Sequence, residues 1–300
     1  MDRSPLRQLG LVVHPTRHLE AVLEGIAGWA SAHGVEVGQV QVAGQTRHVA
    51  EPVEAAACEL LVAVGGDGTT LAALHAGASP SRPVLGVACG SVGVLTSVAG
   101  DEATSALDRF MDGRWAPGDV PGLEVTWDET PGETAINDVA VIRGGPGQLL
   151  VSVCVDDVLY AQLAGDGLVV ATALGSSAYT MAAGGPLLAP GADGMAVTPL
   201  APHGGSCPPL VAGGDSHLSL TIQPGFGGVR FEIDGRPAAA EGLHLAVRVR
   251  PGYATLVRLA DEEPRLTGLR RRGLVLDSPR VLAREARLPD LTLPGVPPSP

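Results

Sequence analysis

The chain has few aromatic side chains, with only three each of Phe, Trp and Tyr among 300 residues. Its interior must therefore be filled by Val, Leu and Ala, within a hydrophobic content of 45%. Glycine and proline are abundant instead, at 41 and 25 residues, so many turns must be tight. This composition predicts a compact, turn-rich α/β or α+β protein. The length is enough for two modest domains, and one large domain stays open.

Positive charge is also scarce. The 20 Lys and Arg residues face 32 Asp and Glu residues, which gives a formal net charge of −12. General affinity for nucleic acid or anionic lipid needs clustered cations, so we expect neither as a partner. The three arginines at 270–272 are interpreted as a solvated turn. An acidic protein can still bind an anionic nucleotide where backbone N–H groups and a divalent metal supply positive potential.

Long apolar runs and paired cysteines are missing. No stretch approaches 18 uninterrupted apolar residues, and residues 1–10 lack the apolar stretch of a signal peptide. The four cysteines, Cys58, Cys89, Cys154 and Cys207, are widely spaced and include no CxxC pair. That spacing is typical of free thiols in a reducing compartment. We therefore expect a cytoplasmic protein that neither spans a membrane nor carries a structural metal.

The first half alternates short apolar runs with helix-like stretches. The predicted strands lie at residues 9–13, 35–42, 60–64 and 84–88, and the predicted helices at 19–33, 70–78 and 102–111. Such alternation implies parallel strands joined by crossover helices. Sheets of this kind bind ligands at the carboxyl ends of their strands.

The second half has a different sequence pattern, which begins after a Pro/Gly-rich stretch at 112–122. We interpret that stretch as a domain boundary. Short β-like segments follow at 123–127, 134–143, 149–155, 158–162, 168–172, 218–223, 229–233 and 243–250. One helical interruption is expected at 177–183 and a short helix at 280–287. The predicted fold class is thus α/β plus all-β, with an open N-terminal α/β domain over residues 1–118 and a β-rich, sandwich-like domain over 119–264.

The segment GGDGTT, residues 65–70, places a glycine pair after a buried strand and a carboxylate, Asp67, where a helix would begin. Glycine lets the backbone turn sharply and approach a ligand, and a helix start presents unpaired N–H groups. That geometry suits a phosphate. The segment is not a Walker A loop, because no Lys follows, and its glycine spacing is not that of the dinucleotide fingerprint.

Two interpretations of Asp67 are open. As a functional group it would meet phosphate through a divalent metal, or accept the proton of a hydroxyl, and both uses belong to phosphoryl transfer. As a structural group it would cap its own helix.

GGDGTT resembles the signature shared by NAD kinases, diacylglycerol-type lipid kinases and 6-phosphofructokinases. Five later stretches are similar to NAD kinases in particular: PVLGVACGSVGVLT at 83–96, INDV at 136–139, GDGLVVATALGSSAYTMAAGGPLLAP at 165–190, VTPLAPH at 197–203 and EIDG at 232–235. The resemblance covers about residues 9–250. It implies transfer of a phosphoryl group from ATP, or from polyphosphate, to the 2′-hydroxyl of the adenosine ribose of NAD, which yields NADP.

The resemblance also implies roles for individual residues. It implies Asp67 as the catalytic carboxylate, Gly65, Gly66, Gly68 and Thr69 as the phosphate-facing turn, and Asn137, Asp138, Asp166, Ser177, Ala178 and Tyr179 as contacts to NAD, with Asp166 at the nicotinamide end. The chemistry agrees, since Asn offers a donor and an acceptor to an adenine edge and a neighbouring carboxylate accepts from ribose hydroxyls. Mg²⁺ or another divalent cation would arrive with ATP, held by phosphates and water.

The family pattern further implies a homodimer or homotetramer, and a C-terminal segment at 265–300 that packs back on the first domain. The chain departs from this pattern at Ala88, where the family usually has Asn, and at Leu174, where it usually has Thr. Two other functions stay open: a nucleotide-binding regulator without turnover, and a kinase for a related nucleotide, a lipid or a small metabolite.

Overall fold

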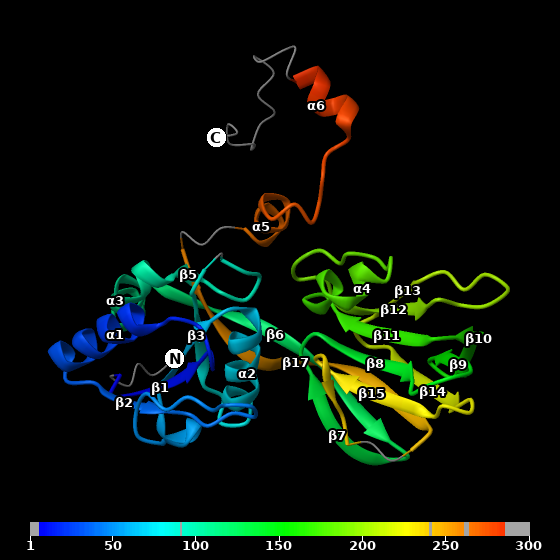
Figure 1. The fold of residues 1–300 in the computed structure, drawn as a ribbon, viewed down its shortest axis with the longest axis horizontal. Helices are drawn as coiled ribbons and strands as arrows, with labels where there is room; N and C mark the ends of the chain where they lie inside the picture. The colour runs from blue at the N-terminus through cyan, green and yellow to red at the C-terminus, as the bar shows by residue number, and fades with distance from the viewer. Residues whose placement is uncertain (1–5, 91, 240–241, 261–263, 286–300) are drawn as a thin grey trace. The chain divides into compact units, whose positions relative to one another are not determined.

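The structure is a computed structural model, and it describes residues 6–90, 92–239, 242–260 and 264–285. The chain divides into two compact units, Met1–Glu262 and Glu263–Pro300. The larger unit holds an α/β half followed along the chain by a β-rich half (Figure 1). The division between domains at residue 118 stays a prediction.

The α/β half is built on four parallel strands in the order β2-β1-β3-β4. The strands are β1 (Gln8–Val13), β2 (Glu36–Gln39), β3 (Leu60–Gly65) and β4 (Pro83–Ala88), with α1 (Glu20–His33), α2 (Asp67–Ala78) and α3 (Ala103–Met111) and the short pieces η1 (Ala55–Ala57), β5 (Val98–Ala99) and η2 (Gly100–Glu102). Every residue of β3 is buried, as expected of a central parallel strand. The predicted alternation of strands and helices is confirmed.

Two boundaries differ from the prediction in this half. The strand predicted at 35–42 ends at Gln39, whose buried side chain accepts from the N–H of Val49 in the following loop at 2.7 Å. Helix α2 begins at Asp67 rather than at residue 70. The carbonyl of Gly66 accepts from the N–H groups of Thr69 and Thr70, both at 3.0 Å, and thereby starts the helix.

The β-rich half contains two sheets whose facing side chains form one core. One sheet has the order β13-β12-β11-β8-β15-β16. Its strands are β8 (Asp138–Arg143), β11 (Gly167–Thr172), β12 (Gly194–Leu200), β13 (Leu210–Gly213), β15 (Val229–Ile233) and β16 (Arg236–Pro237). The other strands are β6 (Trp115–Trp127), β7 (Thr130–Ala135), β9 (Leu149–Val155), β10 (Val158–Gly165), β14 (His217–Gln223) and β17 (His244–Leu259), and they continue the sheet of the α/β half.

Alternate residues of both sheets meet in that core, for example Val139 and Val141 of β8 against Val151 and Val153 of β9. Burial alternates along β9 as in a half-buried strand, whereas β8 is buried at every residue from Asp138 to Ile142. The predicted fold class, an α/β part with a mostly parallel sheet and a β-rich part, is confirmed.

Most of residues 112–122, the stretch interpreted as a domain boundary, lies in β6, which pairs with β17 from Trp115 to Trp127. Pro117 and Pro121 are tolerated for a specific reason. Over this stretch β6 pairs only with β17, so it is an edge strand, and Pro121 lies at the register shift between Arg250 and Ala254. Edge strands and bulges are where proline fits into a sheet.

Strand β17 extends well beyond the predicted segment at 243–250. Its last residues pair with β4 in parallel, Thr255 with Pro83 and Leu256 with Val84, so one strand belongs to both halves of the larger unit. Strands β12 and β13 have no counterpart in the prediction. The helix predicted at 177–183 is two short pieces, η3 (Gly175–Ser177) and α4 (Tyr179–Ala182).

The smaller unit contains α5 (Arg265–Arg271) and α6 (Pro279–Glu285). Helix α6 corresponds to the helix predicted at 280–287, whose last two residues lie outside the described part. Arg270 and Arg271 are the last residues of α5 and Arg272 lies in the turn that follows, so the interpretation of 270–272 as a turn is wrong for the first two arginines and holds for Arg272. Cations at a helix C-terminus are favourable to the helix dipole. No helix in the described ranges is long and apolar enough to cross a membrane, and all four cysteines, each of them described, are free.

Candidate active site

The carboxyl ends of β1, β3 and β4 meet at one edge of the parallel sheet. The N–H of His14, just after β1, donates to Val64 of β3 at 2.9 Å, and the N–H of Cys89, just after β4, donates to Gly65 at 2.7 Å. The GGDGTT turn therefore lies between two other strand-end loops. This is the edge at which open α/β sheets bind ligands.

Asp67 is the first residue of α2, but the N-cap position is Gly66 and no side-chain hydrogen bond caps the helix. The helix-cap interpretation is thus wrong. Instead Oδ2 accepts from the N–H of Val94 at 2.9 Å and Oδ1 accepts from the N–H of Leu95 at 2.8 Å. The half-buried carboxylate holds the loop after β4, and each oxygen retains a lone pair for a further donor.

The glycines of the turn have different structural roles. A methyl group at Gly65 would lie 2.3 Å from Thr69 Oγ1, so Gly65 makes room for the buried Thr69. Gly66 is the extended N-cap of α2, and Gly68 is exposed at its first turn. Gly66 and Gly68 are therefore the accessible part of this turn, whereas the side chain of Thr69 supports it from below.

Arg17 supplies a cation beside this turn, although no motif in the sequence marks it as a site residue. Its Nη1 donates to the carbonyl of Cys89 at 2.7 Å. Methyl groups at Gly66 and Gly90 would lie 3.7 Å and 3.5 Å from the same nitrogen. The exposed guanidinium thus lies next to both glycine turns. Arg47 fixes its backbone by donating from Nη1 to the Arg17 carbonyl at 2.6 Å.

The first two residues of the INDV segment, Ile136 and Asn137, lie in a break between β7 and β8, where a single strand was predicted at 134–143. Asn137 lies in the break, and Asp138 begins β8 with only 5% of its surface exposed. Burial, followed by the nearby carboxylates of Asp234 and Glu232, raises the pKa of Asp138 to about 7. An acid with this pKa gains or loses its proton near neutrality.

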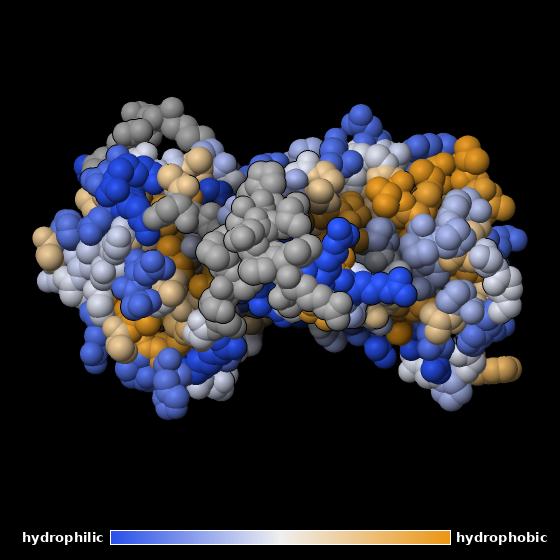
Figure 2. Space-filling view, turned by 90° about the horizontal axis from the view of Figure 1, so that it is seen from above, coloured by the Kyte–Doolittle hydropathy of each residue, from blue (hydrophilic) through white to orange (hydrophobic). Residues whose placement is uncertain are grey.

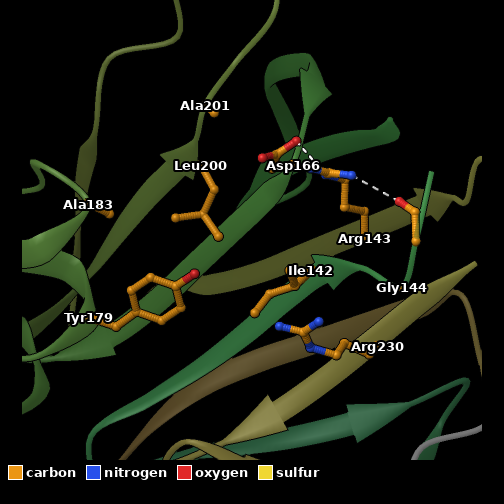
Figure 3. Close-up of a pocket in the computed structure, with 10 residues that line it drawn as sticks. Ile142, Arg143, Gly144, Asp166, Tyr179, Ala183, Leu200, Ala201 and Arg230 are labelled. Atoms are coloured by element: carbon orange, nitrogen blue, oxygen red, sulfur yellow. Dashed lines mark hydrogen bonds and ion pairs between the residues drawn. The ribbon is translucent and has the colours of Figure 1, made fainter. Parts of the chain in front are cut away.

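An open pocket of about 490 Å³ lies in the β-rich half (Figure 3). Asp166 and Tyr179, both expected to contact NAD, line it together. Arg143 Nε bonds Asp166 Oδ1 at 2.6 Å, with both side chains partly exposed. Arg230 lines the pocket as well, and Ile142, Ala183 and Leu200 give it an apolar wall. Two cations, a carboxylate and an aromatic face suit a ligand with phosphates and flat rings.

The remaining expected NAD contacts do not line this pocket. Two of them, Ser177 and Ala178, come directly before Tyr179, which does line it. Ser177 donates from Oγ to the Leu174 carbonyl at 3.1 Å, and Ala178 is exposed before α4. Leu174 itself is 8% exposed and belongs to an apolar cluster with Leu74 of α2 and Ile136. This cluster explains an apolar residue at position 174, since a polar side chain there would be buried among apolar ones.

No group of three or more His, Cys, Asp or Glu residues within the described ranges could hold a metal ion. Asp67 is the carboxylate of the turn, and its oxygens already accept two backbone bonds. The protein groups here fit a cation whose ligands are mainly phosphate oxygens and water.

A parallel sheet with a glycine turn at its carboxyl edge, joined to a β-rich half with a polar pocket, defines an α/β-plus-β protein suited to phosphorylated ligands. Models of the ATP-NAD kinase N-terminal and C-terminal domains match residues 9–115 and 136–259. NAD kinase from Chlorobaculum tepidum is 33% identical over 204 residues, covering 67% of this chain and 71% of that protein. NAD kinase from Azotobacter vinelandii is 33% identical over 214 residues, 69% of each chain. The chain belongs to the NAD kinase family.

Solved structures share the fold at lower identity. Yeast NADH kinase complexed with NADH superposes with a TM-score of 0.77 at 21% identity, over 92% of this chain and 90% of that one. An NAD kinase from Archaeoglobus fulgidus in complex with ATP gives a TM-score of 0.72 at 22% identity, over 90% and 100%. These likenesses extend the agreement in fold over most of the chain.

Proposed function

We propose that the chain transfers the γ-phosphoryl group of ATP to the 2′-hydroxyl of the adenosine ribose of NAD, with NADP and ADP as products. Family membership supports the reaction. The observation that carries it is the placement of Asp67, held by two backbone amides at the carboxyl edge of the sheet with lone pairs to spare. A regulator that only binds nucleotide would gain affinity by losing this negative charge beside phosphate.

In this proposal Asp67 orients the 2′-hydroxyl and accepts its proton. The ribose oxygen forms a bond to the γ-phosphorus while the bond from that phosphorus to the β-γ bridging oxygen breaks, and ADP leaves with the electron pair. Base catalysis by a positioned side chain contributes roughly 10²- to 10⁴-fold to the rate. Preorganisation by the amides of Val94 and Leu95 keeps the carboxylate in place before substrate arrives.

The donor would bind at the glycine turn. Gly66 and Gly68 let phosphate approach the start of α2, and Thr69 and Gly65 shape the turn beneath. Arg17 would supply the positive charge that a Lys supplies in a Walker A loop. A divalent cation bound to ATP would neutralise phosphate charge, with ligands from phosphates and water.

The acceptor would bind along the β-rich half. Asn137 and Asp138 are proposed to hold the adenine and ribose groups, and Ser177 and Ala178 to contact the dinucleotide beside them. Asp166 and Tyr179 would take the nicotinamide end, where the pocket offers a carboxylate and a ring face (Figure 3).

The proposal is tested by incubating purified protein with NAD, Mg²⁺ and either ATP or polyphosphate. Product is measured with an NADP-specific dehydrogenase, and its mass is determined independently. NADP formation with ATP is expected. Binding of NAD without turnover from either donor would instead support a regulator, and phosphorylation of another nucleotide, a lipid or a small metabolite in preference to NAD would identify another kinase.

We also propose that the protein forms homodimers or homotetramers in the cytoplasm. Figure 2 shows hydrophobic side chains gathered on the surface of the β-rich half. Among the exposed apolar residues are Leu150, Val158 and Leu159 on the paired strands β9 and β10, at 44%, 69% and 54% exposure. Exposed apolar patches mark interaction surfaces. Light scattering of the purified protein tests self-association. The proposed location in the cytoplasm is supported by the four free thiols, which are typical of a reducing compartment.

A further inference from the structure

We propose that His75 is a positioning residue for NAD: through Asp234 it ties the segment that carries Asn137 and Asp138 to the helix that carries Asp67. The inference rests on the proposed function. His75 makes no contact with substrate in this proposal. Its side chain, on α2, holds the NAD-binding segment in register with the catalytic carboxylate two turns earlier on the same helix.

The first link is a short hydrogen bond between two parts of the chain that are 159 residues apart. His75 Nε2 lies 2.6 Å from Asp234 Oδ2. The side chain of Asp234 is fully buried, at 0% exposure, and that of His75 is 18% exposed. A bond to a buried carboxylate is among the stronger hydrogen bonds, and breaking it leaves the carboxylate short of a partner.

The second link joins Asp234 to the NAD-binding segment. Its oxygens accept from the backbone N–H groups of Ile136 at 3.0 Å, Asn137 at 2.6 Å and Asp138 at 3.2 Å. Its own N–H donates to the carbonyl of Asp138 at 2.9 Å. One carboxylate thus gathers three successive amides, and the strand break at this segment follows from it.

The turn that carries Asp234 explains how the carboxylate reaches this position. Asp234 and Gly235 are the two residues between β15 and β16, and both have positive φ, at 52° and 72°. Two-residue hairpin turns in which both residues have positive φ favour the sequence Asp-Gly. The tight turn presents the Asp234 side chain to the segment at 136–138.

The opposite side of the segment is held by β11 and the residues after it. Thr172 Oγ1 donates to the Ile136 carbonyl at 2.7 Å, and Thr172 N donates to the Asn137 carbonyl at 2.9 Å. A methyl group at Gly175 would lie 1.9 Å from the Asn137 carbonyl oxygen. The carbonyl groups of the segment are therefore fixed by these contacts. Its amide N–H groups are oriented by their bonds to Asp234.

Tyr253 sets the orientation of the His75 ring. Tyr253 Oη lies 3.2 Å from His75 Nδ1, and the two rings meet edge to face with centroids 5.8 Å apart. With Nε2 donating to the carboxylate, a neutral ring accepts at Nδ1 from the tyrosine hydroxyl, so both nitrogens are satisfied. The network from β17 through α2 to the β15–β16 turn is continuous.

The test compares three replacements of His75 and one of Tyr253. His75→Gln keeps an N–H donor within reach of Asp234, His75→Asn keeps a polar amide of shorter reach, and His75→Leu removes the donor. Each variant is examined by steady-state kinetics with NAD and ATP varied separately. Hydrogen exchange of the amides at 136–138 is measured in the protein without nucleotide.

His75→Leu and His75→Asn are expected to raise the KM for NAD about tenfold, the order expected when a hydrogen bond to a charged group is lost, and to leave the KM for ATP within about twofold. Exchange of the three amides should accelerate in both. His75→Gln should restore both readouts to near the wild type. Tyr253→Phe, which keeps the ring and loses the hydroxyl, should have an effect smaller than that of His75→Leu.

Unchanged exchange at 136–138 in His75→Asn, or an equal rise of both KM values, would overturn the positioning role. The same conclusion follows if His75→Gln is as impaired as His75→Asn. The exchange readout needs no turnover, so wild-type protein that shows the expected exchange pattern yet makes no NADP would refute the proposed reaction alone. If His75→Leu does not fold, the Gln and Asn pair decides the question.

Discussion

Gly93 and Asp67 fit together so closely that position 93 has no room for a side chain. A methyl group on Gly93 would lie 2.0 Å from Asp67 Oδ1. The next two residues of the loop donate their amides to the same carboxylate. The glycine loop after β4 and the carboxylate at the start of α2 therefore form one structural unit, and the family motifs at 65–70 and 83–96 are two halves of it.

Gly93→Ala tests this unit directly. The added methyl must displace the Asp67 carboxylate or the loop, and a misplacement of about 1 Å can reduce catalysis about 100-fold. We expect kcat to fall by about that order while the circular dichroism spectrum is unchanged. Gly28→Ala is the matched control, because a methyl group there meets nothing within 4 Å on the exposed side of α1. The control should keep full activity, and full activity in both variants would contradict the account.

Arg17→Gln tests the cation beside the glycine turn. Loss of a charge-assisted bond to phosphate is expected to raise the KM for ATP by roughly tenfold or more, with the KM for NAD little changed. Arg114→Gln removes an exposed arginine paired with Asp112 near the end of α3 and should leave both constants unchanged. An Arg17 variant in which NAD binding weakens and ATP binding does not would refute the assignment.

Asp138→Asn is expected to change how stability depends on pH. The pKa of Asp138 is raised from its ordinary value of 3.8 to about 7 in the folded protein, so between these values the folded state binds more protons than the unfolded state. The stability of the wild type therefore falls, through this group, as pH rises from about 4 to about 7. The amide does not titrate, so the variant loses this contribution to the pH dependence.

Chemical unfolding of both proteins between pH 4 and pH 8 measures the effect. The free energy of unfolding of the variant, relative to the wild type, should increase up to about pH 7 and then level off. A difference that is constant across this range would show that the Asp138 carboxyl titrates near its ordinary pKa in the folded protein.

Much of the fold could be predicted from periodicity, because the alternation of apolar runs and helix-like stretches reflects local burial. Residues 112–122 could not, since Pro117 and Pro121 obscure the local strand pattern and the residues of β17 that pair with this stretch lie 128 to 144 positions further along the chain. The second part of β17 was missed for a related reason. Its pairing with β4 joins residues 172 positions apart, as with Thr255 and Pro83, and no local pattern reports it.

The candidate site shows the same limit. Asp67 and its turn could be found because strand, glycine pair and helix are contiguous. The partners that fix the site are distant: Gly93 and Leu95 for Asp67, and Asp234 for His75, 159 residues away. In the sequence, nothing distinguishes His75 from the other residues of a predicted helix, and nothing distinguishes Arg17 from other exposed cations. Only the three-dimensional arrangement identifies their neighbours.

The measurement that tests the central claim most directly compares the wild type with Asp67→Asn. Asparagine keeps the shape of the side chain and one acceptor oxygen but cannot take the proton of the ribose hydroxyl. The account predicts that kcat for NADP formation falls by roughly 10²- to 10⁴-fold, while the Kd for NAD measured by calorimetry stays within a few-fold of the wild type. Undiminished kcat in the variant would contradict it.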